Sequence, residues 1–98
     1  MQAPALSVVI AVYNRPVTIQ QALQSALDQD YAGRYEVIVI DDGSTDSTPE
    51  VLAAYGQRVH IIRQQHLGRS AARNAGVRYS SANLVAFLDS DAYLPPVR

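Results

Sequence analysis

The stretch VIVIDDGS, residues 37–44, is a run of four β-branched apolar residues that ends in two aspartates and a turn. A second stretch of similar design, LVAFLDSD, occupies residues 84–91. Short apolar runs that end in turn residues are typical of buried parallel strands. Carboxylates at the carboxyl ends of such strands lie where open α/β sheets bind ligands. We therefore expect a site for a metal and a phosphorylated ligand at this edge of a sheet.

The segments around these two stretches alternate between strand and helix patterns. The expected elements, in chain order, are strand 6–12, helix 17–28, strand 36–40, a helix that begins within 46–50 and ends near Gly56, strand 59–62, helix 68–79 and strand 84–88. This alternation predicts an α/β fold, a Rossmann-like open parallel sheet with helices on both faces, in a single domain over residues 1–98. The expected strand order is 3-2-1-4, which brings the ends of strands one, two and four to one crevice.

Two of the expected helices carry further signals. Ser47 and Glu50 have the spacing of a capping box, in which each side chain bonds the other residue's backbone N–H. In the last helix an alanine-rich face, Ala71, Ala72 and Ala75, predicts a close approach to the sheet. The third strand is short and is expected near an edge of the sheet. Strand four is expected at the other edge, beside an apolar surface, and such a surface favours self-association.

The composition excludes several classes of function. The formal net charge is -1, so nothing indicates nucleic acid as a partner. The chain contains no cysteine, which excludes a disulfide framework, a thiol nucleophile and a thiolate metal site. All 8 basic residues are arginine, which excludes a catalytic lysine. No apolar run approaches the roughly 20 residues needed to span a bilayer, so we expect a cytoplasmic domain, with any membrane anchor outside this chain.

Four segments together resemble family 2 glycosyltransferases, the inverting nucleotide-sugar enzymes of GT-A fold. The segment 6–15 is similar to the family's opening strand, and 37–46 resembles its second-strand signature. The segment 68–76 looks like its third-helix motif, and 87–91 resembles its metal-binding D-x-D. Because the four motifs stand in the right order and cover nearly the whole chain, their combination is far more specific than any one of them.

The resemblance implies a set of binding residues and a cofactor. The expected nucleotide-binding residues are Ala11, Val12, Tyr13, Asn14, Asp42, Arg73 and Asp89. Among them, Asp42 is expected to contact the base and Arg73 to lie near the nucleotide. Asp91 and Asp89 are the expected metal residues, which would hold ribose and a divalent metal, Mn²⁺ or Mg²⁺, that bridges the diphosphate. The implied donor is a nucleotide sugar, most often a UDP-sugar by the habit of the family.

The resemblance also implies what this chain lacks. Family members continue into a half that binds the acceptor and carries the base that deprotonates the acceptor hydroxyl. No residue here can take that role, so we expect a donor-binding fragment of a longer enzyme, inactive alone. The acceptor would be a saccharide or a lipid-linked saccharide, and the parent protein would act in the cytoplasm or at the inner face of the membrane. Ala92 and His66 depart from the family pattern, which more often has aspartate and asparagine there.

Other interpretations of the same residues remain open. The main alternative is a non-catalytic nucleotide-binding or interaction module. Receiver domains and haloacid-dehalogenase-type phosphatases also place aspartates after strands, but both use a lysine that this chain lacks. The aspartates of 41–46 could merely form a turn and a helix start. Ordinary structural or surface positions are expected for His60, His66, Arg69 and Arg78.

Overall fold

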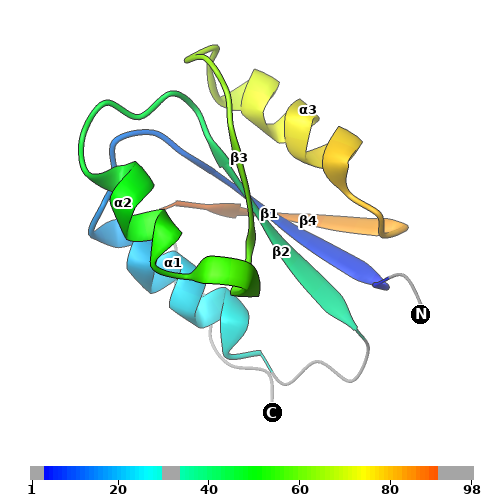
Figure 1. Cartoon of the computed structure of the whole chain (residues 1–98). Coiled ribbons are helices and arrows are strands. Elements are labelled where there is room, and N and C mark those ends of the chain that lie inside the picture. Colours follow the sequence, from blue (N-terminus) through cyan, green and yellow to red (C-terminus); the bar gives the residue numbers. More distant parts are fainter. Residues whose placement is uncertain (1–3, 30–33, 91–98) are drawn as a thin grey trace.

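Four parallel strands form one sheet in the order β3-β2-β1-β4 in the computed structural model, which describes residues 4–29 and 34–90 (Figure 1). The elements are β1 (Leu6–Val12), α1 (Thr18–Leu27), β2 (Tyr35–Asp41), α2 (Thr48–Ala53), the 3₁₀ helix η1 (Gly56–Arg58), β3 (His60–Arg63), α3 (Arg69–Tyr79) and β4 (Leu84–Asp89). The α/β fold, the element order and the strand order 3-2-1-4 predicted from the sequence are confirmed.

The register of the sheet decides where its polar residues lie. Strand β1 is central and pairs with β2 on one side and with β4 on the other. Ala11 lies between Ile40 of β2 and Asp89 of β4, and Val12 pairs with Asp41. Since all four strands run in the same direction, their carboxyl ends meet at one edge of the sheet. The two acidic stretches therefore come together although they are far apart in the sequence.

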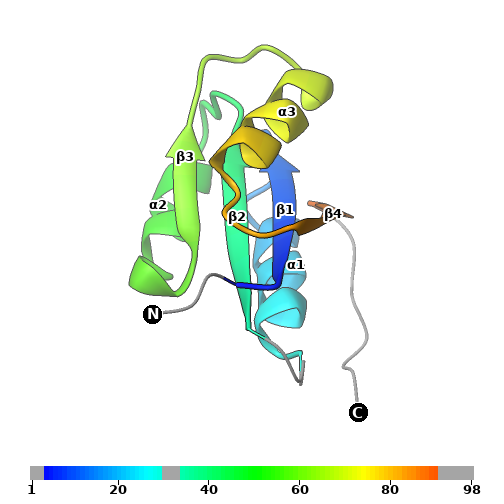
Figure 2. The ribbon, with the colours of Figure 1, turned by 90° about the vertical axis from the view of Figure 1, so that its right-hand side faces the viewer.

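Helices cover both faces of the sheet, as predicted (Figures 1 and 2). One face packs against α1 and α2, where Ile19, Leu23 and Leu52 join the inward side chains of β1 and β2 in the larger core cluster. The other face packs against α3, where Ala72 joins Val9 in a smaller cluster. The β-branched run of β2 is buried on both faces, which explains why it reads as continuously apolar rather than alternating.

Helix α3 approaches the sheet closely because small residues face it. A Cβ added at Gly76 would lie 2.3 Å from Val9 Cγ1, so no larger residue fits there without movement. Ala72, one turn earlier, is fully buried. The predicted close approach of the alanine-rich helix is confirmed, and Gly76 contributes to it as much as the alanines.

The predicted capping box at the start of α2 is wrong. Ser47 occupies the N-cap position of α2, but its side chain makes no capping hydrogen bond. Instead Asp46 Oδ1 accepts hydrogen bonds from the backbone N–H of Thr48 at 2.9 Å and from its hydroxyl at 2.6 Å. An aspartate bonded to the residue two positions on forms an Asx turn, which competes with the capping box for the same backbone.

Strand β4 lies at an edge of the sheet, as predicted, and β3 at the opposite edge. Two large apolar side chains of β4 are exposed, Leu84 at 62% and Phe87 at 47%. Within residues 4–29 and 34–90, no helix has the length and apolar character required to cross a membrane.

Candidate functional site

Two adjoining cavities form a crevice at the carboxyl edge of the sheet. The larger has a volume of about 230 Å³ and the smaller about 150 Å³. They share the lining residues Ala11, Arg15, Arg69 and Ser90, so they are parts of one space. The crevice lies where β1 separates β2 from β4, which is the switch point at which open α/β sheets bind ligands.

An aromatic pair stands at the larger cavity. The rings of Tyr13 and His66 stack with their centroids 4.0 Å apart and their planes at 26°. Tyr13 follows β1 and remains 39% exposed, whereas His66 belongs to the segment between β3 and α3. Ala11 and Val12 line the same cavity beside Tyr13, so these three predicted residues do come together. A flat ring that is partly open to solvent offers a stacking surface for a base.

The Asp42 carboxylate is the organising group of this cavity. Its Oδ1 accepts hydrogen bonds from Gln64 Nε2 at 2.8 Å and from the Leu67 N–H at 2.9 Å. Its Oδ2 accepts one from the Gly68 N–H at 3.0 Å and lies 3.0 Å from His66 Nδ1. The carboxylate therefore fixes the segment 64–68 and the beginning of α3, which together form one wall of the cavity.

The surroundings of Asp42 lower the pKa of its carboxyl. Burial alone would raise the pKa, because a charged group loses its hydration. The hydrogen bonds from Gln64, Leu67 and Gly68, together with the nearby His66, outweigh burial and bring the pKa below the ordinary value of 3.8. Asp42 is thus a carboxylate at neutral pH, and its negative charge is already satisfied by the protein.

The first aspartate of the DDGS turn has a structural role. Asp41 is 1% exposed, pairs with Arg63 Nη1 at 2.8 Å and accepts a hydrogen bond from the Ser44 N–H at 3.0 Å. Gly43 adopts a φ of +77°, and a Cβ there would lie 2.7 Å from the His66 backbone nitrogen. Only glycine therefore allows the turn after β2 to touch the segment before α3.

Asn14 connects two loops. Its φ of 52° is in the left-handed region, where asparagine is tolerated better than most residues. Its Oδ1 accepts a hydrogen bond from the Thr45 N–H at 2.8 Å, and its backbone N–H donates to Ser44 Oγ at 3.0 Å. The side chain thus joins the loop after β1 to the loop after β2. Its predicted contact with a nucleotide stays a prediction, and the structure assigns it a positioning role as well.

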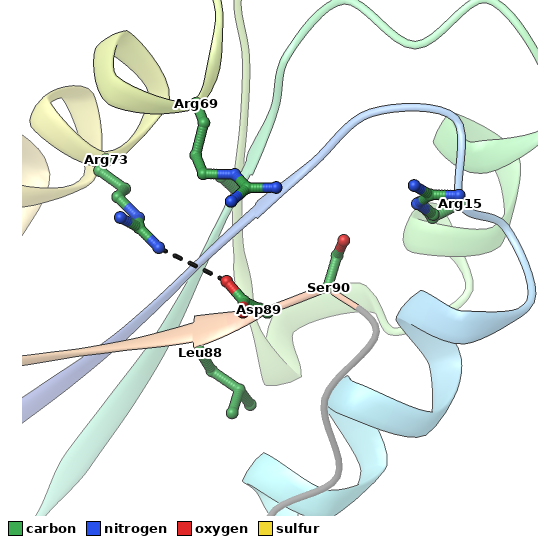
Figure 3. Close-up of a pocket in the computed structure, with 7 residues that line it drawn as sticks. Arg15, Arg69, Arg73, Leu88, Asp89 and Ser90 are labelled. Atoms are coloured by element: carbon green, nitrogen blue, oxygen red, sulfur yellow. Dashed lines mark hydrogen bonds and ion pairs between the residues drawn. The ribbon is translucent and has the colours of Figure 1, made fainter.

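The smaller cavity is lined by cations around the end of β4. Figure 3 shows Arg69 and Arg73 reaching from α3 toward Asp89 and Ser90, while Arg15 approaches from the loop after β1. Arg73 Nη2 lies 3.4 Å from Asp89 Oδ1, and the Arg73 guanidinium also lies 5.4 Å from the centre of the Phe87 ring. The predicted residues Arg73 and Asp89 therefore do share one site.

The described residues can supply one ligand of the predicted metal. The Asp89 side chain is 58% exposed, and within the described part of the chain it is bonded only by the long contact with Arg73, so its oxygens are accessible there. Asp91 lies outside the described residues. Within 4–29 and 34–90, no group of three or more His, Cys, Asp and Glu residues could hold a metal by itself. Asp89 fits Mg²⁺ or Mn²⁺ as a hard oxygen ligand, with the remaining ligands coming from phosphate and water.

Several residues at the crevice are absent from the site predicted from the sequence, among them His66 and Arg69, which line it, and Gln64, which bonds Asp42. The sequence predicts an ordinary structural role for His66 and a surface position for Arg69, and it predicts no role for Gln64. Gln64 and His66 contact Asp42, and His66 and Arg69 line the larger cavity. None of these contacts is with a neighbour in the sequence. The signal that could have found Arg69 is its place directly after Gly68, at the beginning of the third-helix motif.

A crevice of this kind, at the switch point of a parallel sheet, is typical of α/β domains that bind nucleotides. The sequence model described as glycosyl transferase family 2 matches residues 7–98 of this chain. The chain belongs to glycosyltransferase family 2.

Curated relatives and solved structures agree with this family. Glycosyltransferase AglE of Haloferax volcanii is 41% identical over 90% of this chain and 31% of its own length. Validoxylamine A glucosyltransferase of Streptomyces hygroscopicus subsp. limoneus is 43% identical over 95% of this chain and 22% of its own length. The mannosyltransferase PcManGT from Pyrobaculum calidifontis, in complex with GDP-Man and Mn²⁺, superposes on 97% of this chain and 30% of its own, with a TM-score of 0.81 and 27% identity.

A second solved structure gives the same result. S. aureus TarS 1-349 in complex with UDP superposes on 90% of this chain and 28% of its own, with a TM-score of 0.75 and 31% identity. The chain thus has the fold of glycosyltransferases and spans less than a third of the length of each of these four proteins.

Proposed function

We propose that this chain is the donor-binding part of an enzyme that transfers a sugar from a nucleoside diphosphate to an acceptor hydroxyl. The observation that carries the proposal is the crevice, which joins an aromatic ring at Tyr13 to a cluster of arginines around Asp89. A nucleotide has the matching arrangement, with a flat base at one end and phosphates at the other. The family and the nucleotide complexes of two similar structures support the same donor class.

In this proposal each part of the crevice has a task. Tyr13 stacks on the base, Asp42 contacts it, and Ala11 and Val12 form the wall beside it. Arg73 lies near the nucleotide, and Asp89 with Asp91 holds the ribose and a divalent metal, Mn²⁺ or Mg²⁺. When bound, that metal would offset the charge of the departing diphosphate. The complex of PcManGT with Mn²⁺ is consistent with this choice of metal.

The transfer itself needs groups outside this chain. The bond between the anomeric carbon and the diphosphate oxygen breaks, and the acceptor oxygen bonds to that carbon from the opposite side. The proton of the acceptor hydroxyl passes to a base that these 98 residues do not supply, and the nucleoside diphosphate leaves. We propose a UDP-sugar as donor and a saccharide or lipid-linked saccharide as acceptor, with a parent protein in the cytoplasm or at the inner face of the membrane.

The experiment is a calorimetric titration of UDP, GDP and dTDP into this chain, with and without Mn²⁺. We expect one nucleotide to bind best and to bind more tightly with the metal. Asp91→Asn and Asp89→Asn should each remove most of the gain from Mn²⁺, because each variant removes a charged oxygen ligand. Asp28→Asn, at the exposed end of α1, is the matched control and should bind as the parent chain does.

The outcomes separate the two candidate functions. Metal-dependent binding of one nucleotide that is lost in the Asp91 variant supports the donor site. Nucleotide binding without any effect of metal or of the aspartate variants favours a non-catalytic binding module instead. If no nucleotide binds, the donor-site proposal is wrong for this chain.

We also propose that the isolated chain self-associates. Among the described residues, β4 has no strand beside it on its outer side, and the exposed side chain of Leu84 lies at that edge. Edges of this kind pair readily with a second copy.

A further inference from the structure

Two arginines of the smaller cavity have no partner among the described residues. Within 4–29 and 34–90, the guanidinium groups of Arg15 and Arg69 contact no carboxylate and no carbonyl, whereas Arg73 is paired with Asp89. All three line a cavity of about 150 Å³ whose only described carboxylate is that of Asp89. Among the described residues, three positive charges against one negative charge leave this space with an excess of positive charge.

Arg69 lies at the beginning of α3, where a positive side chain is less favourable than a negative one. It is the first residue of α3, an 11-residue helix whose N-cap Gly68 provides no side-chain hydrogen bond. A helix N-terminus carries a partial positive charge and free N–H groups, so a cation there is locally destabilising. The Asp42 carboxylate already accepts a hydrogen bond from the Gly68 N–H at this terminus, and an anion in the cavity would in addition pair with the Arg69 side chain.

The backbone that carries Arg15 is held in place by the start of α2. The Arg15 N–H donates to Thr48 Oγ1 at 3.2 Å, and the same hydroxyl donates to Asp46 Oδ1 at 2.6 Å. Thr48 is fully buried. The loop after β1 therefore presents Arg15 at a fixed position at the rim of the crevice, opposite Arg69 and Arg73 (Figure 3).

We infer that Arg15 and Arg69, together with Arg73 and the first turn of α3, bind the diphosphate of the donor directly. This inference rests on the proposed donor-binding function and adds to it two residues, Arg15 and Arg69, that contact phosphate without the metal. Guanidinium forks match phosphate oxygens in geometry and remain charged at every physiological pH. Part of the affinity for the diphosphate should therefore remain when a chelator removes the metal.

The test is a titration of inorganic pyrophosphate and of UDP into the 98-residue chain in the presence of EDTA. We expect pyrophosphate to bind more tightly than orthophosphate. Arg15→Gln and Arg69→Gln should each weaken binding of pyrophosphate and UDP about tenfold, since each variant removes charged hydrogen bonds to the ligand. Arg69→Lys keeps the charge but not the fork, and should fall between Arg69→Gln and the parent chain.

Arg78→Gln is the matched control. Arg78 is exposed in the last turn of the same helix and does not line the cavity. This variant therefore changes the net charge equally but leaves intact the phosphate cradle, by which we mean Arg15, Arg69, Arg73 and the first turn of α3. Equal weakening by Arg78→Gln and Arg69→Gln would overturn the inference, because binding would then follow net charge alone. Circular dichroism of each variant confirms that a loss of binding is not a loss of folding.

The same titrations distinguish this inference from the proposed function. If UDP binds with Mn²⁺ but pyrophosphate does not bind in EDTA and Arg69→Gln has no effect, the cradle is wrong and the donor site stands. If pyrophosphate binds through the arginines but no nucleotide binds more tightly than pyrophosphate, the cradle is supported and the nucleotide donor is refuted.

Discussion

At the scale of single residues, Asp42 connects the fold to the site. Its carboxylate accepts three hydrogen bonds from the segment 64–68 and lies against His66, while it also lines the larger cavity. The residue that is proposed to contact the base is therefore the residue that holds one wall of the pocket. A substitution at Asp42 affects both, so its effect on stability must be measured beside its effect on binding.

We expect Asp42→Asn to lower the free energy of unfolding by about 1–3 kcal/mol, since an amide presents one acceptor where two are used. Denaturation by urea at neutral pH measures this change. Asp28→Asn is the control, because Asp28 accepts one exposed side-chain hydrogen bond, from Gln24, and should change stability by less than about 0.5 kcal/mol. Equal stability of the Asp42 variant and the parent chain would contradict the organising role of this carboxylate.

The lowered pKa of Asp42 predicts how the stability of the fold depends on pH. The pKa of Asp42 is lower in the folded chain than its ordinary value of 3.8. Its contribution to stability is therefore complete above that value and is lost as the pH falls through the lower, folded pKa. The difference in stability between the parent chain and Asp42→Asn should be constant near neutral pH and should shrink below about pH 4. Urea denaturation at a series of pH values tests this, and a difference that grows on acidification would contradict it.

Most of the candidate site could be predicted from the sequence, but the role of His66 could not. The aspartates were found because they follow apolar strands, which is a local pattern. His66 gains its importance from Tyr13 and Asp42, which lie on other loops. Those contacts form only when the segment 64–68 folds back across the end of β2, and no periodicity of the sequence encodes that path.

At the scale of elements, the strands were predictable because their apolar runs are sharply bounded. The sequence predicts β1 with the limits 6–12 that the structure has, whereas β2 and β3 differ from their predicted limits by one residue at each end and β4 by one residue at its last position. The start of α2 was not predictable in detail, because Asp46, Ser47 and Glu50 all carry side chains that can cap a helix. The local geometry after the DDGS turn selects Asp46, and only the structure provides that geometry.

The close packing of α3 on the sheet leads to a prediction at the same scale. Gly76→Ala should lower the free energy of unfolding by about 1–3 kcal/mol, because the new methyl group would overlap Val9 and push the helix from the sheet. The gain in helix propensity from glycine to alanine, at most about 1 kcal/mol, opposes this only in part. Thermal or urea denaturation measures the net effect.

A substitution at Val9, the residue that the new methyl group would overlap, tests whether this contact causes the loss of stability. Val9→Ala removes the methyl groups that the new Cβ would meet, so the double variant should lose less stability than the two single variants together. Strictly additive losses would mean that the contact between residues 9 and 76 is not the cause.

At the scale of the whole molecule, the proposed self-association through the edge at β4 leads to a prediction for the isolated chain. Sedimentation velocity at increasing concentration should reveal association of the parent chain. Leu84→Lys should weaken it, because a charge on an edge strand opposes strand pairing. Val17→Lys is the control, since Val17 is 75% exposed but lies at the start of α1, away from that edge. A monomer at every concentration would refute the proposed self-association.

The central place of β1 has a consequence for the newly made chain. Leu6 pairs with Leu84, so β1, which is synthesised before the other three strands of the described sheet, receives one of its two neighbours only after 78 further residues have been added. At about 5–20 residues per second this takes roughly 4 to 16 s. During translation one side of β1 therefore lacks its partner strand until β4 has been synthesised, and the described sheet can form in full only after that point.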